Sequence, residues 1–298
     1  MTGIEAPQTT REIRQPKKRT SLLRSATWPA RISMVILAVI CVLAVIGPWI
    51  TPHNPAQIDV TRALLPPFTS DPGFYLLGTD NLGRDIFSRL IVGSRISILV
   101  GVLGVAVAGV IGVTIGIVAG YFGGWVDAVL MRIVDAFLSI PTILLILAVL
   151  AILDPGVTTL IIVLGLTTWV IYARQVRNEV LEIRERLFVK AARTFGSGNF
   201  FIATRHILVN VIPTFVVLST LSVAALIVTE SSLSFLGLGI QPPDVSWGLM
   251  LTGGRDYLAT AWWVSTFPGL AITLTVLCIL FIGDWLRAHL DPRLKATM

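Results

Sequence analysis

Between two long apolar stretches this sequence carries one long charged segment, residues 174–210. A helix through its first half would carry Arg186, Lys190 and Arg193 along one edge, and the glycine-rich turn at 196–198 would end that helix. Cations beside a compact turn can bind another surface by charge and shape, and the isolated His206 of this segment indicates no catalytic role. The segment therefore predicts docking rather than catalysis.

The same segment also carries apolar side chains at helical spacing. They are Val176, Val180, Ile183, Leu187 and Ala191, followed by Phe195, Phe200 and Phe201. This stripe predicts that the helix of the preceding span continues beyond the bilayer, breaks at 196–198, and is followed by a short second helix over about 199–208. A loop that only faces solvent does not require apolar side chains, whereas a projecting loop that inserts into a partner's groove does.

Other kinds of chemistry are absent from the sequence. There is no G-x-x-x-x-G-K-[ST] phosphate-binding loop, and none of the four lysines follows a glycine. The H-E-x-x-H, G-x-S-x-G and strand-linked G-x-G-x-x-G patterns are missing as well. Cys41 and Cys278 lie inside apolar stretches without metal-ligand spacing, which favours two small buried side chains, and His206 stands alone. We expect neither an enzyme nor a metal site.

Four charged residues lie at or near membrane depth: Arg132, Asp135, Glu230 and Asp284. An ion-coupled secondary carrier keeps such groups well inside its helix bundle. The three acids here lie near the ends of predicted spans, which favours interfacial charge or a helix-end contact over a proton relay. A secondary carrier stays an alternative. A membrane enzyme or scaffold is another, although the catalytic constellation or large soluble domain that it needs is missing.

The elements that position the charged segment are membrane helices. Only 13% of the residues are charged, against about 25% in soluble proteins, and the mean hydropathy is +0.83. Six stretches are apolar enough to cross about 30 Å of hydrocarbon. They are 32–50, 96–121, 136–153, 156–172, 209–229 and 262–283. We expect an all-α polytopic membrane protein with six transmembrane helices, the first being an anchor and not a cleaved signal.

The distribution of lysine and arginine predicts the orientation. Most of them lie in the N-terminal tail, in 174–206 and after the last span, so these parts and both termini are expected in the cytoplasm. The net charge of +6 includes no basic stripe interleaved with aromatics, so no nucleic acid partner is expected. The predicted organisation is a cytoplasmic basic tail (1–31), a first helix with an extracytoplasmic loop (32–95), a five-helix core (96–290) containing the cytoplasmic loop 174–209, and a cytoplasmic tail (291–298).

Small residues recur at every fourth position of the second predicted span. Gly104, Ala108, Gly112, Gly116 and Gly120 form one ridge of that helix. Small side chains let another helix approach closely, so the ridge predicts a tightly packed neighbour. The spacing alone does not say whether this neighbour belongs to the same chain.

The charged loop resembles the "EAA" loop of ABC-importer permeases, whose pattern is E-A-A, three residues, G, nine residues and I-x-L-P. Here Ala191, Ala192, Gly196 and Leu208 stand at the family spacing. Lys190 replaces the glutamate, Val209 replaces the proline, and His206 stands at the isoleucine position, as it often does in the peptide-transport branch.

Three further stretches extend the resemblance over nearly the whole chain. LGTDNLGRDIFSRLIVGSRISILVG (77–101), ESSLSFLGLGIQPPDVSWGLML (230–251) and GDWLRAHLDPRLK (283–295) are similar to the second permease subunit of dipeptide and oligopeptide importers. The resemblance implies the type I ABC-importer fold in the cell membrane of a prokaryote. It also implies that peptides are the cargo, with nickel complexes or glutathione as alternatives.

The resemblance further implies partners: a related second permease, two cytoplasmic ATPases, an extracytoplasmic binding protein, and membrane lipid around them. ATP and Mg²⁺ would be bound by the ATPases and no cofactor by this chain, in keeping with the missing phosphate-binding loop. The residues implied to contact an ATPase are Lys190, Ala191, Ala192, Phe195, Gly196, Ser197, Gly198 and Leu208.

Overall fold

The computed structural model describes residues 26–70 and 73–290, and these residues form helices and loops without a β-strand. The helices are α1 (Trp28–Ile50), α2 (Ile86–Phe122), α3 (Gly124–Leu138), α4 (Thr142–Leu150), α5 (Val157–Arg184), α6 (Leu187–Thr194), α7 (Asn199–Phe201), α8 (Val209–Phe235), α9 (Trp247–Gly254) and α10 (Trp263–Leu290). Most of the predicted N-terminal tail, and all of the C-terminal tail 291–298, lie outside the described residues. The all-helical class is confirmed.

Five helices of the described chain are long and apolar enough to cross a membrane, and the bent pair α3–α4 can count as a sixth. The third predicted span, 136–153, is not one continuous helix, because it covers the end of α3 and all of α4, which are bent by 80° relative to each other. The chain breaks at Ser139-Ile140-Pro141. Proline has no N–H for the helix ladder and disfavours helical geometry at the residue before it, which explains the break.

Helix α2 begins at Ile86, ten residues before the predicted start of the second span. Its first turn is capped by Asp85, whose carboxylate accepts hydrogen bonds from the Ser88 amide (3.0 Å) and the Ser88 hydroxyl (2.5 Å). Ser88, Arg89 and Ser94 are buried in this first part of the helix although they are polar. Hydropathy assigned this polar stretch to the outer loop, which in fact ends before Ile86.

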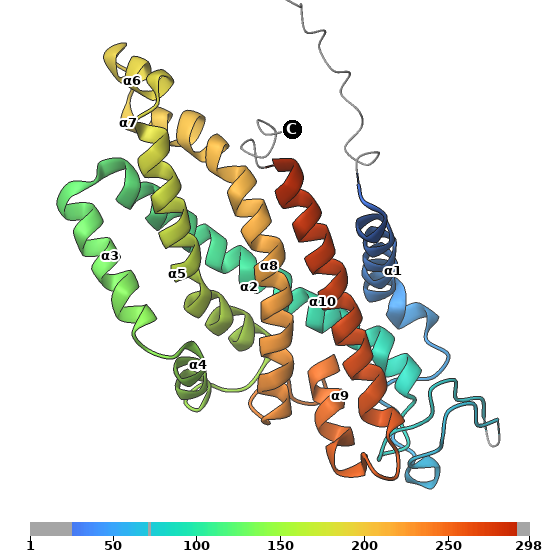
Figure 1. The fold of residues 1–298 in the computed structure, drawn as a ribbon. Helices are drawn as coiled ribbons and strands as arrows, with labels where there is room; N and C mark the ends of the chain where they lie inside the picture. Colours follow the sequence, from blue (N-terminus) through green and yellow to red (C-terminus); the bar gives the residue numbers. More distant parts are fainter. Residues whose placement is uncertain (1–25, 71–72, 291–298) are drawn as a thin grey trace, which may run out of the picture.

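Figure 1 shows which elements lie at each end of the helical bundle. The start of α1, the end of α10 and the loop with α6 and α7 lie at one end of the bundle, and α9 and the loop 51–85 lie at the other. Both ends of the helical part therefore lie on one face, as an even number of crossings requires. By the predicted charge distribution this face is the cytoplasmic one.

The small-residue ridge of α2 packs against helices of the same chain. A Cβ atom on Gly112 would lie 2.4 Å from the carbonyl oxygen of Trp169, and one on Gly116 would lie 2.8 Å from that of Ala173. Both carbonyls belong to α5. Gly120 meets α5 in the same way, Gly104 meets Leu226 of α8, and Ala108 is fully buried. The backbones of α2 and α5 thus approach more closely than any other side chain would permit.

Glu230 is completely buried near the end of α8 and contacts the start of α9, which is the helix-end contact that its place in the span predicted as one of two alternatives. The hydroxyls of Ser234 and Ser246 both donate to its Oε1 atom at 2.8 Å. Each hydroxyl oxygen also accepts a backbone N–H, from Ile240 and Leu249 respectively. The carboxyl group therefore holds α8 to the start of α9.

We expect Glu230→Gln to fold with nearly unchanged stability, because the amide oxygen can accept both hydroxyls. Glu230→Ala leaves two buried hydroxyls without their acceptor and should cost about 2–4 kcal/mol. Thermal unfolding of the purified protein in detergent measures both changes. Equal loss in the two variants would contradict this role of the Oε1 atom.

Candidate functional site

The charged loop is a helical corner followed by a glycine turn. Helix α5 ends at Arg184 and α6 starts at Leu187 after a change of direction. Helix α6 ends at Thr194, and two residues later Gly196 has a left-handed backbone with φ +78°. The amides of Gly196 and Ser197 donate to the carbonyls of Arg193 and Ala192, both at 3.0 Å. This is a Schellman C-cap, in which glycine carries the positive φ at least cost.

The rear of the loop is an apolar cluster. Val189 of α6, with Ile202 and Ile207 of the following segment, is fully buried among Val176, Val180 and Ile183 of α5. The predicted apolar stripe is thus confirmed in part. Val176, Val180 and Ile183 are buried, but Leu187 and Ala191 are exposed. The corner between α5 and α6 rotates the second half of the stripe outward, and Val189 takes the inner position.

The front of the loop exposes large aromatic side chains. Phe195 is 87% exposed and Phe200 is 82% exposed, and both flank the glycine turn. Such side chains are costly to leave in water, and two of them beside a rigid turn form a surface suited to a partner's groove. The predicted site residues Lys190, Ala191, Gly196 and Gly198 are exposed as well, whereas Ala192, Ser197 and Leu208 are partly buried.

Polar contacts tie the loop to the cytoplasmic end of α2. The Tyr121 hydroxyl donates to Oδ1 of Asn199 at 2.9 Å, and the Arg193 guanidinium lies 4.6 Å from the centre of the Tyr121 ring. Arg184 donates to the carbonyl of Gly120 at 2.8 Å. Sequence reasoning missed Tyr121, Asn199 and Arg184 as positioning residues. No short-range spacing could have indicated them, because their partners lie 64 to 78 positions away.

Lys190 is paired within its own chain. Its Nζ lies 3.0 Å from Oε2 of Glu185, the residue after α5. The hydrogen bond from Lys190, followed by its charge, lowers the pKa of Glu185. The cation that replaces the family glutamate therefore pairs with an acid of its own chain at the corner between α5 and α6.

Ion pairs between α3 and α5 brace the base of the loop. Arg177 donates to both carboxylate oxygens of Asp127, with the Nε–Oδ1 bond at 2.9 Å, and Arg174 pairs with Asp135. On the other side of α5, the Thr214 hydroxyl of α8 donates to Glu179 at 3.0 Å. The helix that carries the loop is thus linked to α2, α3 and α8.

The loop returns to the membrane without a break. Residues 202–208 form a π-helix that runs directly into α8. A displacement of the turn at 196–198 can therefore pass into two long helices, through α6 into α5 and through the π-helix into α8. Such wide turns often occur at functional positions.

These features define a class: a polytopic membrane protein with a rigid, aromatic-tipped loop on one face and no phosphate-binding motif of its own. Comparison with known proteins identifies the family within this class. Residues 112–296 match the model of the binding-protein-dependent transport system inner membrane component, and residues 28–67 match the N-terminal TM domain of oligopeptide transport permease C. The chain belongs to this family of transport-system inner-membrane components.

Several curated relatives cover most of the chain. A probable D,D-dipeptide transport system permease protein of Escherichia coli is 39% identical, over 88% of this chain and 86% of its own length. The dipeptide transport system permease protein of Bacillus subtilis is 41% identical, over 89% and 82%. The nickel transport system permease protein of Escherichia coli is 37% identical, over 91% and 96%.

Proposed function

We propose that this chain is the permease subunit of an ATP-driven peptide importer, and that loop 174–209 couples it to a separate ATPase. It would form half of the translocation path beside a related second permease. A binding protein would deliver di- or oligopeptides from outside, and two ATPases would bind ATP and Mg²⁺. The observation that carries the coupling role is the exposed aromatic tip on a loop whose rear is buried and tethered.

Coupling needs a loop that moves as one body with its helices. The buried Val189, Ile202 and Ile207 make the loop stiff, and the contacts of Tyr121 and Arg193 hold it to α2. When the two ATPases close, a force on the turn at 196–198 would tilt α5 and α8 relative to the rest of the bundle. The path would then change from inward- to outward-facing.

The names of the relatives support peptides as the cargo, since two of those above are dipeptide permeases. A nickel complex is the second candidate, supported by the nickel permease at 37% identity. Glutathione has no observation in its favour. An ion-coupled carrier loses support, because Asp135 pairs with Arg174 and Glu230 is held by serine hydroxyls.

We expect Phe195→Ala to weaken capture of the ATPase at least tenfold, because an exposed aromatic side chain at a docking tip is the kind of residue that dominates binding. The variant should fold normally, since Phe195 contributes little to the buried cluster. Co-purification of the ATPase from detergent-solubilised membranes measures the effect. The matched control is Phe74→Ala, another exposed phenylalanine on the opposite face. Undiminished capture with Phe195→Ala would contradict the docking role.

A further inference from the structure

A cavity of about 210 Å³ lies at the outer end of the molecule, far from the charged loop. It opens where the loop before α2 meets α9 and the start of α10, and its lining includes Asp80, Arg84, Arg89, Leu249, Met250 and Val264. Its size suits one amino-acid residue rather than a whole oligopeptide. Nothing in the coupling mechanism uses this cavity.

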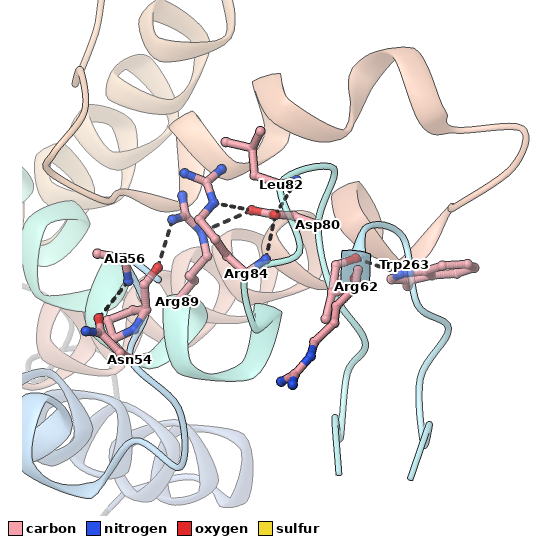
Figure 2. A network of polar contacts seen from close by, with 10 residues as sticks. Asn54, Ala56, Arg62, Asp80, Leu82, Arg84, Arg89 and Trp263 are labelled. Carbon is pink, nitrogen blue, oxygen red and sulfur yellow. Dashed lines mark hydrogen bonds and ion pairs between the residues drawn. The ribbon is translucent and has the colours of Figure 1, made fainter. Parts of the chain in front are cut away.

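The charges of the lining residues are unbalanced in favour of cations. Asp80 pairs with both Arg84 (2.7 Å) and Arg89 (3.5 Å) through its Oδ2 atom, as Figure 2 shows. Among the described residues, Asp80, Arg84 and Arg89 are the charged residues that line the cavity, so this part of its lining carries one excess positive charge.

The guanidinium groups also have spare donors. Arg84 uses only its Nε, while Arg89 uses Nε toward Asp80 and Nη1 toward the carbonyl of Pro55 at 3.1 Å. Their other N–H groups have no hydrogen-bond partner among the described residues. Arg89 is only 4% exposed, so its charge is poorly solvated by bulk water. A bound anion would satisfy these donors and balance the charge.

An anion alone would leave other groups of the cavity without a partner. The amide of Asn81 also lines it, and the buried Oδ1 atom of this side chain has no hydrogen-bond partner in the described structure. An acceptor of this kind is satisfied by an N–H donor. Leu249, Met250 and Val264 form an apolar wall beside these polar groups. The fitting ligand therefore combines an anion, an adjacent N–H group and an apolar side chain.

We propose that this cavity binds the carboxyl-terminal residue of a short peptide. The terminal carboxylate accepts hydrogen bonds from Arg84 and Arg89, the backbone N–H of the same residue donates to the Asn81 amide oxygen, and its side chain packs on the apolar wall. An aspartate or glutamate side chain of a docking protein fits less well, since its carboxylate is separated from its own backbone N–H by one or two more bonds than in a C-terminal residue. The assignment rests on the proposed function only in taking peptides as the cargo.

The test is direct binding of a dipeptide to the full chain, purified in lipid nanodiscs without ATPase or binding protein. Equilibrium dialysis compares radiolabelled Ala-Phe with its C-terminal amide. We expect the amide to bind roughly tenfold more weakly, because it lacks the anion. Since no ATPase and no uptake enter this measurement, failure of the coupling proposal leaves its outcome unchanged.

Two variants locate the site. Arg84→Gln should weaken binding of Ala-Phe roughly tenfold while keeping a donor for Asp80. Gly253 also lines the cavity, so Gly253→Leu should block it without changing an arginine. The backbone has room for the new side chain, since a Cβ atom there meets only Asn81 Oδ1, at 3.9 Å. The matched control is Arg255→Gln, which removes an exposed cation on the same face outside the cavity, and it should bind normally.

The proposal is overturned if the unchanged protein does not bind Ala-Phe, if the amide binds equally well, or if both cavity variants bind like the control. A third measurement distinguishes a peptide from an acidic side chain of the binding protein as the source of the carboxylate. If Arg84→Gln weakens capture of the extracytoplasmic binding protein while peptide binding is absent, the cavity receives an acidic side chain of that protein, and the assignment to peptides is wrong.

Discussion

Gly196→Asp is expected to abolish uptake while leaving folding and membrane insertion intact. The structure separates these two effects. Gly196 is exposed, and a Cβ atom there meets nothing within 4 Å. Its φ of +78° lies in the left-handed region, which aspartate enters more readily than most residues, so the strain should be about 1 kcal/mol. A carboxylate at the tip would, however, be buried without a partner when the turn enters a groove of the ATPase.

The chain offers a closely matched control for this variant. Gly124 also has a positive φ (+55°), nothing within 4 Å of its Cβ position, and a place at the cytoplasmic end of α2 and α3. Gly124→Asp introduces the same side chain into the same kind of backbone, and it should transport normally. Uptake of a labelled peptide into cells or vesicles holding the full complex measures both variants. Normal uptake with Gly196→Asp would refute the coupling role of this loop.

Gly112→Val is expected to prevent α2 and α5 from packing together and to lower the yield of folded protein severely. Its Cβ atom would lie 2.4 Å from the carbonyl oxygen of Trp169 and 2.5 Å from the Cβ of Tyr172. Neither neighbour is the end of a flexible side chain, so α2 and α5 must move apart along their contact. Overpacking of this kind costs about 3 kcal/mol or more, because the dispersion contacts of the whole ridge weaken together.

The yield of monodisperse protein after detergent extraction, and its thermal midpoint, report this loss. Gly156→Val is the matched control, since Gly156 has an extended backbone with φ 170° and open space around its Cβ position at the start of α5. It should behave like the unchanged protein. A normal yield and midpoint for Gly112→Val would show that the ridge does not pack as described.

Several features of the molecule could be predicted from the sequence because they depend on neighbouring residues. Membrane class and most span positions follow from hydropathy over about 20 consecutive residues. The end of α6 follows from Gly196, because glycine is the residue that adopts the left-handed backbone of a helix C-cap with the least strain. The ridge of α2 follows from a spacing of four, whereas the docking role of the loop stays a prediction from the aromatic side chains beside its turn.

The remaining features were decided only by the tertiary structure. Helix α2 starts at Ile86 because its polar first turns are buried beside Asp80 and Pro55, and no window of local hydropathy registers such partners. Distant contacts likewise make α5 the partner of the ridge and place Glu230 inside the fold. The physical reason is common to these cases. A buried polar or small residue is defined by what it meets, and its partner can lie on another element, 16 positions away for Glu230 and Ser246 and 34 for Arg89 and Pro55.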